Sequence, residues 1–227
     1  MPRRFVTLDV FTGEQLAGNP LAVVLDAEGL DDRRMQAIAK EFNLSETVFV
    51  APAADPRQRA DIRIFTPGRE LPFAGHPTVG TAVLLALLDQ NGQPGAVAFG
   101  LKEKVGIVSC AVEVEGEGIG HARFRLPRLP ELWGEGLESA ACAWALGLEP
   151  QEIGFERHVP SRHTAGVPYD LVPVASLDVL ARARPNGEAF AKAFGNSEHP
   201  AAYVYARDPQ RQSGFRARMF APGLGIV

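Results

Sequence analysis

The sequence predicts an α+β fold made of two copies of one unit. The first observation is an internal repeat: the segment 48–67 (VFVAPAADPRQRADIRIFTP) is echoed by the segment 203–222 (YVYARDPQRQSGFRARMFAP). Both read as a strand, an Asp-Pro loop with Arg and Gln, and a strand ending in Phe-x-Pro. The second observation is a helix beginning at Gly75, which is apolar on nearly every side from Val79 to Leu88. A helix of that kind is buried, so a sheet should surround it.

The repeat divides the chain into an N-terminal domain, residues 1–117, and a C-terminal domain, residues 118–227. The first copy leads into the helix that begins at Gly75, whereas the second copy leads only into Gly223 to Val227. We therefore expect the second domain to be incomplete, without a central helix. The inner face of its sheet should then have no apolar partner within the chain.

The elements of the first domain follow from local patterns. Arg4 to Phe11 alternates as a half-buried strand does, and Asp31 and Asn43 suit the two ends of a helix between them. Gly80 lies inside the central helix, where glycine costs up to about 1 kcal/mol relative to alanine, so we expect close packing there. The remaining predicted strands of this domain are 21–25, 48–52, 61–65, 96–102 and 104–116.

The segment 116–120 is rich in glycine but lies between two alternating strands with no helix after it. It is therefore predicted to be a hairpin turn and not a phosphate-binding loop. Beyond it the sequence predicts strands at 121–127, 155–160, 201–208 and 215–222, a turn and a buried strand within 165–174, and helices at 138–146, 176–183 and 187–194.

The start of the central helix, Gly75-His76-Pro77, is the most promising binding feature. Proline is tolerated in a first helical turn because its missing N–H has no partner within the helix. The free N–H groups and the positive end of the helix dipole can bind an anion such as a substrate carboxylate. An ordinary buried helix with a histidine near its cap is the alternative interpretation.

Composition excludes several classes of protein. The formal net charge is -4, whereas a nucleic-acid-binding domain is usually basic. No apolar run suggests a signal peptide or a membrane-spanning helix. Two cysteines are too few for a disulfide framework, so we expect a cytoplasmic protein. The five histidines show no metal-ligand spacing, and neither a Gly-x-Ser-x-Gly elbow nor a nucleotide-binding fingerprint is present.

Several motifs together resemble the PhzF-like phenazine-biosynthesis isomerase family. They cover the first half densely and the second half thinly. The matching segments are 9–11 (DVF), 18–24 (GNPLAVV), 35–36 (MQ), 43–47 (NLSET), 63–67 (RIFTP), 70–78 (ELPFAGHPT), 80–82 (GTA), 166–168 (GVP), 171–174 (LVPV) and 218–222 (RMFAP).

The resemblance implies a diaminopimelate-epimerase-like fold, in which two similar domains wrap curved sheets around central helices and the active site lies between them. It also implies a homodimer and proton-transfer isomerisation without a cofactor. By position, Glu46 matches the family's catalytic carboxylate, and Gly75 and His76 match its substrate-binding helix start. A carboxyl group can take and give a proton near neutral pH when burial favours its protonated form. From the sequence alone, a surface carboxylate at the end of a strand is the favoured interpretation of Glu46, and the resemblance reverses it.

This sequence also departs from the family pattern. The family continues after Phe-Ala-Pro with an acidic helix start, which is not found here, so we expect a fragment of a longer product, with a degenerate member as the alternative. Ala74 precedes Gly75, and Cys110 and Cys142 are interpreted as core residues, which argues against the two-thiol mechanism of racemases on this fold. The predicted function is isomerisation of a small carboxylate, such as a dihydro-hydroxyanthranilate-like or amino-acid-like compound. The alternative is a non-catalytic remnant that only binds small carboxylates.

Overall fold

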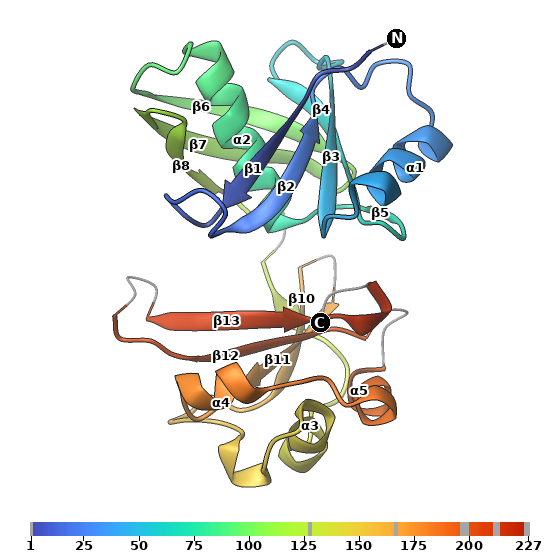
Figure 1. Cartoon of the computed structure of the whole chain (residues 1–227), viewed down its shortest axis with the longest axis vertical. Coiled ribbons are helices and arrows are strands. Elements are labelled where there is room, and N and C mark those ends of the chain that lie inside the picture. Colours follow the sequence, from blue (N-terminus) through green and yellow to red (C-terminus); the bar gives the residue numbers. More distant parts are fainter. Residues whose placement is uncertain (1, 127–128, 166–167, 196–199, 211–213, 225–227) are drawn as a thin grey trace. The chain divides into compact units, whose positions relative to one another are not determined.

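The computed structural model describes residues 2–126, 129–165, 168–195, 200–210 and 214–224. The chain forms two compact units, Met1–Arg128 and Leu129–Val227 (Figure 1). Of the segments discussed above, residues 127, 166–167, 211–213 and 225–227 lie outside the described residues. The predicted boundary after residue 117 is wrong, because the strand Ile119–Phe124 pairs with the strand Gly106–Gly116 of the first sheet.

The first unit is one curled sheet around one helix. The sheet has the strand order β1-β2-β3-β4-β6-β7-β8, with β5 beside β4. The helix α2 contacts β1 and β2 near one end of this order and β7 and β8 at the other, so the sheet curls around it (Figure 1). The elements are β1 (Phe5–Val10), β2 (Asn19–Val24), α1 (Asp32–Phe42), β3 (Glu46–Ala51), β4 (Ala60–Phe65), β5 (Glu70–Leu71), α2 (Gly75–Asp89), β6 (Gly95–Glu103), β7 (Gly106–Gly116) and β8 (Ile119–Phe124).

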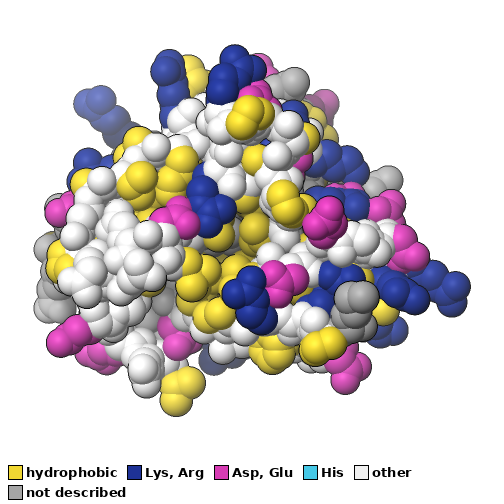
Figure 2. Space-filling view, turned by 90° about the horizontal axis from the view of Figure 1, so that it is seen from above, with side chains coloured by type: hydrophobic (Ala, Val, Ile, Leu, Met, Phe, Trp, Pro, Cys, Tyr) yellow, Lys and Arg dark blue, Asp and Glu magenta, His cyan; other side chains and the backbone are white. Residues whose placement is uncertain are grey.

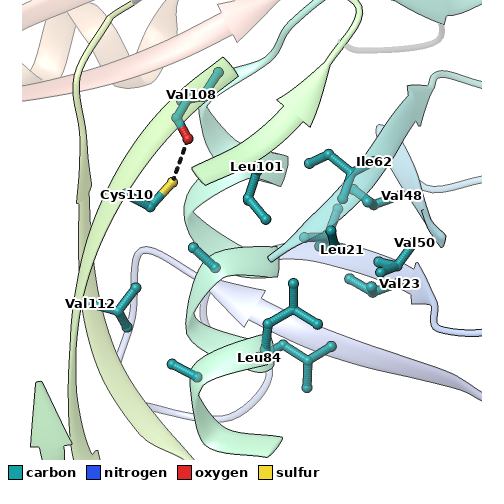
Figure 3. Close-up of a cluster of buried hydrophobic side chains, with 14 of the residues drawn as sticks. Leu21, Val23, Val48, Val50, Ile62, Leu84, Leu101, Val108, Cys110 and Val112 are labelled. Carbon is teal, nitrogen blue, oxygen red and sulfur yellow. Dashed lines mark hydrogen bonds between the residues drawn. The ribbon is translucent and has the colours of Figure 1, made fainter. Parts of the chain in front are cut away.

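The core of the first unit explains why α2 is apolar on nearly all sides. Figure 3 shows Leu84 of α2 among side chains that come from strands on different sides of the helix. Gly80 is the point of closest approach, since a Cβ atom there would lie 2.7 Å from Val10 Cγ2 and 2.8 Å from Leu21 Cδ2. The expected close packing at Gly80 is therefore confirmed.

The helix α1 covers the opposite face of the sheet. The Asp31 carboxylate accepts a hydrogen bond from the Arg34 N–H at 2.8 Å, and Asn43 ends the helix in the left-handed region with φ 52°. Both predicted caps are confirmed. Met35 and Ala39 of α1 pack in one cluster with Phe49 and other residues of the sheet.

The second unit has a five-stranded sheet with the order β13-β12-β11-β10-β9. Its helices α3, α4 and α5 provide buried residues to one core cluster together with β11, β12 and β13. The elements are β9 (Glu131–Leu132), α3 (Ser139–Leu146), a 3-10 turn (Pro150–Glu152), β10 (Ser161–Thr164), β11 (Pro168–Pro173), α4 (Leu177–Arg182), α5 (Gly187–Phe194), β12 (Ala202–Arg207), β13 (Phe215–Phe220) and a second 3-10 turn (Pro222–Leu224).

The internal repeat is confirmed at the level of topology. In the first unit β1-β2-β3-β4 pair antiparallel, parallel and antiparallel, and β10-β11-β12-β13 pair in the same sequence of directions in the second. Both Asp-Pro loops are built alike, because Asp55 accepts a hydrogen bond from the Arg57 N–H and Asp208 accepts one from the Gln210 N–H.

The inner faces of the two sheets differ. In the second unit the cross-strand row Leu171–Tyr203–Met219 occupies the face opposite α3, α4 and α5. Tyr203 is 42% exposed, and Leu171 and Met219 are half-buried. Among the described residues this face therefore stays partly open, as expected from the sequence.

Three smaller predictions were also tested. The segment 155–160 is not a strand: Phe155 and His158 close a turn by two main-chain hydrogen bonds, and their rings stack 4.4 Å apart. The glycine-rich segment does form the β7–β8 hairpin turn, where Glu117 and Gly118 have φ of 52° and 82°. None of the helices in the described part of the chain combines the length and the apolar character needed to cross a membrane.

Candidate active site

The three site residues predicted from the sequence lie together in the first unit. The parallel strands β2 and β3 begin side by side, with Leu21 opposite Glu46. Glu46 is the first residue of β3, and Gly75 and His76 are the first two residues of α2. The start of α2 thus meets the starts of two neighbouring strands, which brings a carboxylate and an imidazole to one place.

Each ring nitrogen of His76 lies at hydrogen-bond distance from an oxygen atom. Its Nδ1 lies 3.0 Å from Glu46 Oε2, and its Nε2 lies 3.1 Å from the main-chain oxygen of Asn19. The side chains of His76 and Glu46 are 9% and 14% exposed. The two groups are therefore mostly buried but still reachable from solvent.

These contacts fix how many protons the pair holds. A main-chain oxygen can only accept, so the His76 Nε2 must carry a hydrogen. The Nδ1 then faces Glu46 in one of two ways: as an N–H that donates to the carboxylate, or as a bare nitrogen that accepts from the protonated acid. In either form one proton lies between Glu46 and His76. The pair can therefore donate a proton and accept one back.

The start of α2 offers main-chain donors beside this pair. The cap residue Ala74 is extended, with φ −152°, and makes no side-chain cap hydrogen bond. The N–H groups of Gly75 and His76 have no partner within the helix, because the first turn never does. Gly75 has no side chain, and Phe124 packs 3.4 Å from where its Cβ would lie. An anion could approach these N–H groups closely.

Two neighbours of the site were missed by the sequence analysis. Asn19 holds His76 through its main-chain oxygen. Phe11 follows β1 with φ 66°, is 71% exposed, and its ring centre lies 5.9 Å from that of His76. A bulky residue rarely adopts a positive φ without cause, but that conformation leaves no signal in a single sequence. Asn19 carried no signal either, since its main chain makes the contact.

The two thiols lie in the protein core, as expected. Cys110 and Cys142 are buried, at 3% and 0% exposure, and burial raises the pKa of each thiol to about 12. Neither is therefore a thiolate near neutral pH. Over the described residues, no three His, Cys, Asp or Glu side chains are grouped as metal ligands would be.

The chain matches a family model and several known proteins. Residues 8–227 match the model described as phenazine biosynthesis-like protein. An uncharacterized isomerase from Mesorhizobium japonicum is 50% identical over 97% of this chain and 74% of its own length. The trans-2,3-dihydro-3-hydroxyanthranilate isomerase of Pseudomonas aeruginosa is 44% identical over 99% of this chain and 73% of its own length.

A solved structure supports the fold. The PhzF-family phenazine biosynthesis protein of Bacillus anthracis superimposes with a TM-score of 0.81 at 27% identity, covering 100% of this chain and 75% of the other. The predicted α+β class with the diaminopimelate-epimerase-like fold is confirmed. On the extent of the family match and the identity of these relatives, the chain belongs to the phenazine biosynthesis-like, or PhzF, family.

Proposed function

We propose that this protein is an isomerase that moves a proton on a small carboxylate substrate, with Glu46 as the group that takes and returns the proton. One observation carries the proposal: both ring nitrogens of His76 lie at hydrogen-bond distance from oxygen atoms, so the Glu46–His76 pair holds one proton between its members. Membership of a family whose relatives are named isomerases supports it.

In this proposal the start of α2 binds the substrate carboxylate. The N–H groups of Gly75 and His76 are the donors, and the positive end of the helix dipole adds a favourable interaction. The same groups would stabilise negative charge that develops on the substrate during proton transfer. His76 would hold Glu46 in place through Nδ1, while the Asn19 main-chain oxygen fixes the ring.

The reaction step balances without a further reactant. The Glu46 carboxylate removes a proton from one carbon, and the C–H electron pair enters the neighbouring unsaturated system. The protonated Glu46 then returns the proton to a different carbon of that system. The substrate is isomerised and Glu46 returns to its starting state, so the proposed step needs no cofactor.

The names of the relatives support the proposed substrate class. The curated relative from Pseudomonas aeruginosa is named for trans-2,3-dihydro-3-hydroxyanthranilate, an unsaturated ring acid with the carboxylate and the mobile proton that this mechanism needs. We propose a dihydro-hydroxyanthranilate-like or amino-acid-like carboxylate for this chain, and with it a role in phenazine-type biosynthesis. We also propose that the protein is a homodimer and that it is located in the cytoplasm.

The test is the rate of isomerisation of trans-2,3-dihydro-3-hydroxyanthranilate by the wild type and by Glu46→Gln. General acid–base catalysis contributes about 10² to 10⁴-fold, so we expect a rate loss of at least about 10²-fold in the variant. Gln keeps the shape of Glu, so substrate binding measured by calorimetry should change little. Glu41→Gln on the exposed face of α1 is the matched control. An unchanged rate in Glu46→Gln would contradict the role of Glu46, and binding without conversion by the wild type would favour the carboxylate-binding alternative.

A further inference from the structure

A second buried carboxyl group contacts the first turns of α2. Glu103 is the last residue of β6 and is only 3% exposed. Its Oε1 lies 2.8 Å from the hydroxyl oxygen of Thr78 in the first turns of α2. The same hydroxyl donates to the Ala74 main-chain oxygen at 2.7 Å. A chain of two short contacts therefore joins Glu103 to the residue that caps α2.

The two contacts can both be hydrogen bonds in only one protonation state. The Thr78 hydroxyl has a single hydrogen, and the Ala74 oxygen can only accept. If that hydrogen goes to Ala74, the contact between Thr78 and Glu103 needs a hydrogen from Glu103. An ionised Glu103 would leave one of the two contacts as a repulsive approach of oxygen atoms. The geometry therefore fits a protonated carboxylic acid.

The surroundings of Glu103 also disfavour a negative charge. Its Oε2 is buried and has no hydrogen-bond partner among the residues that the structure describes. The nearby charged groups are engaged elsewhere: Lys104 with Glu70, and His76 with Glu46. From β7 the titratable neighbour is the thiol of Cys110, whose pKa is itself raised by burial and by Glu103. Burial raises the pKa of Glu103 to about 7, whereas a hydrogen bond donated by Thr78 to the carboxylate would act in the opposite direction.

We propose that Glu103 is a positioning residue which, as a neutral acid, holds the anion-binding start of α2 through Thr78 and Ala74. Its proton is donated to Thr78, and the Thr78 hydrogen is donated to Ala74. This fixes the peptide that joins Ala74 to Gly75, and with it the direction of the Gly75 N–H. The catalytic consequence of this arrangement rests on the proposed function, whereas the protonation of Glu103 does not.

The proposal predicts a loss of order at the helix start as Glu103 ionises. Because the folded protein holds this proton more tightly than a free glutamic acid does, the protonated arrangement is complete at low pH. It is lost as pH rises through about 7. With Glu103 ionised, the single hydrogen of the Thr78 hydroxyl can be donated to Glu103 or to Ala74 but not to both. The other contact then becomes repulsive, and the direction of the Gly75 N–H is less well fixed.

The first experiment follows the side-chain carboxyl carbon of Glu103 and the amide of Gly75 by NMR as pH is raised. We expect the Glu103 carbon to titrate near neutral pH and the Gly75 amide to shift with the same midpoint. Glu103→Gln, which keeps a neutral donor to Thr78, should remove that component of the Gly75 shift. A Glu103 carbon that is already ionised well below neutral pH, or a Gly75 amide that does not follow it, would overturn the proposal.

The second experiment measures KM and kcat for trans-2,3-dihydro-3-hydroxyanthranilate across the same range. We expect the wild-type KM to rise about tenfold above the Glu103 midpoint, the size of effect that loss of one well-aimed hydrogen bond gives. The KM of Glu103→Gln should lack this rise, while that of Glu103→Met, which has no donor, should be high at every pH. An identical KM profile in the wild type and Glu103→Gln would overturn the positioning role. A wild-type protein with no isomerase activity would instead contradict the proposed function. The NMR titration would still show whether Glu103 is protonated.

Discussion

Four strands of each unit have the same order and directions, but the inner faces of the two sheets are covered to different extents. In the first unit the row Val23–Val48–Ile64 lies between the sheet and α2 and is at most 1% exposed. The repeat aligns it with the row Leu171–Tyr203–Met219 of the second unit, where Tyr203 is 42% exposed. The repeat therefore sets the topology, whereas an apolar helix decides whether the inner face becomes a core.

The candidate chemistry differs between the units in the same way. The position that Glu46 occupies in the first copy is taken by Ala201 in the second, two residues before Tyr203. The first unit thus brings together a carboxylate, an imidazole and a helix start, while the second copy has no acid at the aligned position. On the opposite face of the sheet it is the second unit that carries the acid. Ala22 of the first unit aligns there with Asp170, which pairs with the buried Arg162.

The largest expected effect comes from that buried ion pair. Arg162 Nε donates to Asp170 Oδ1 at 3.1 Å, and both side chains are under 10% exposed. Asp170→Ala would leave a buried charge without its carboxylate, which costs about 3–5 kcal/mol. The chain's two tryptophans, Trp133 and Trp144, both lie in the second unit, so tryptophan fluorescence during urea unfolding reports this unit.

The control for this prediction is the double variant Arg162→Leu/Asp170→Ala. It should recover much of the lost stability, because no buried charge is left alone. A loss below about 1 kcal/mol in Asp170→Ala would show that the pair is not essential to the second unit.

The next effect tests the inner faces directly. Ile64→Ala removes a side chain that is 1% exposed, and should cost about 2–5 kcal/mol through lost burial and the cavity that remains. Met219→Ala removes the half-buried equivalent and should cost about 1 kcal/mol. Urea unfolding followed by circular dichroism reports both units, and tryptophan fluorescence isolates the second. Equal losses in the two variants would contradict the difference between the faces.

A smaller effect is expected at the close approach within the first unit. Gly80→Ala would bring a Cβ to within 2.8 Å of side-chain atoms of Val10 and Leu21. Overpacking of this kind costs about 1–3 kcal/mol, which outweighs the gain of up to about 1 kcal/mol from replacing glycine in a helix. Thermal unfolding should show a net loss of stability. Gly13→Ala, with no atom within 4 Å of the new Cβ, is the control, and a Gly80→Ala protein more stable than the wild type would refute the packing argument.

Local patterns predicted much of the fold because they act within a few residues. The caps Asp31 and Asn43 and the buried helix after Gly75 were readable from the sequence, and the repeat predicted that the two units are copies of one another. The boundary after residue 117 was wrong because it divides the predicted hairpin at 116–120, whose two strands pair within one sheet. The segment 155–160 was misassigned because His158 has a partner distant in the sequence: its Nδ1 lies 2.9 Å from the Tyr205 hydroxyl oxygen, and its ring stacks on Phe155.

Part of the candidate site could likewise be predicted from the sequence, and part could not. Family motifs pointed to Glu46, Gly75 and His76, and the structure brings all three together. The contact of Asn19 is made by its main chain, and the role of Glu103 depends on burial and on Thr78, so neither could be read from residue types. Glu103 looks in the sequence like any polar residue at the end of a strand.

The most direct test of the account is proton exchange between solvent and substrate. Wild-type protein in heavy water should place deuterium on trans-2,3-dihydro-3-hydroxyanthranilate or its product, because the proton held by Glu46 and His76 exchanges with solvent. Glu46→Gln should bind the same compound and place none. Deuterium incorporation by Glu46→Gln at the wild-type rate would contradict the claim that Glu46 carries the proton.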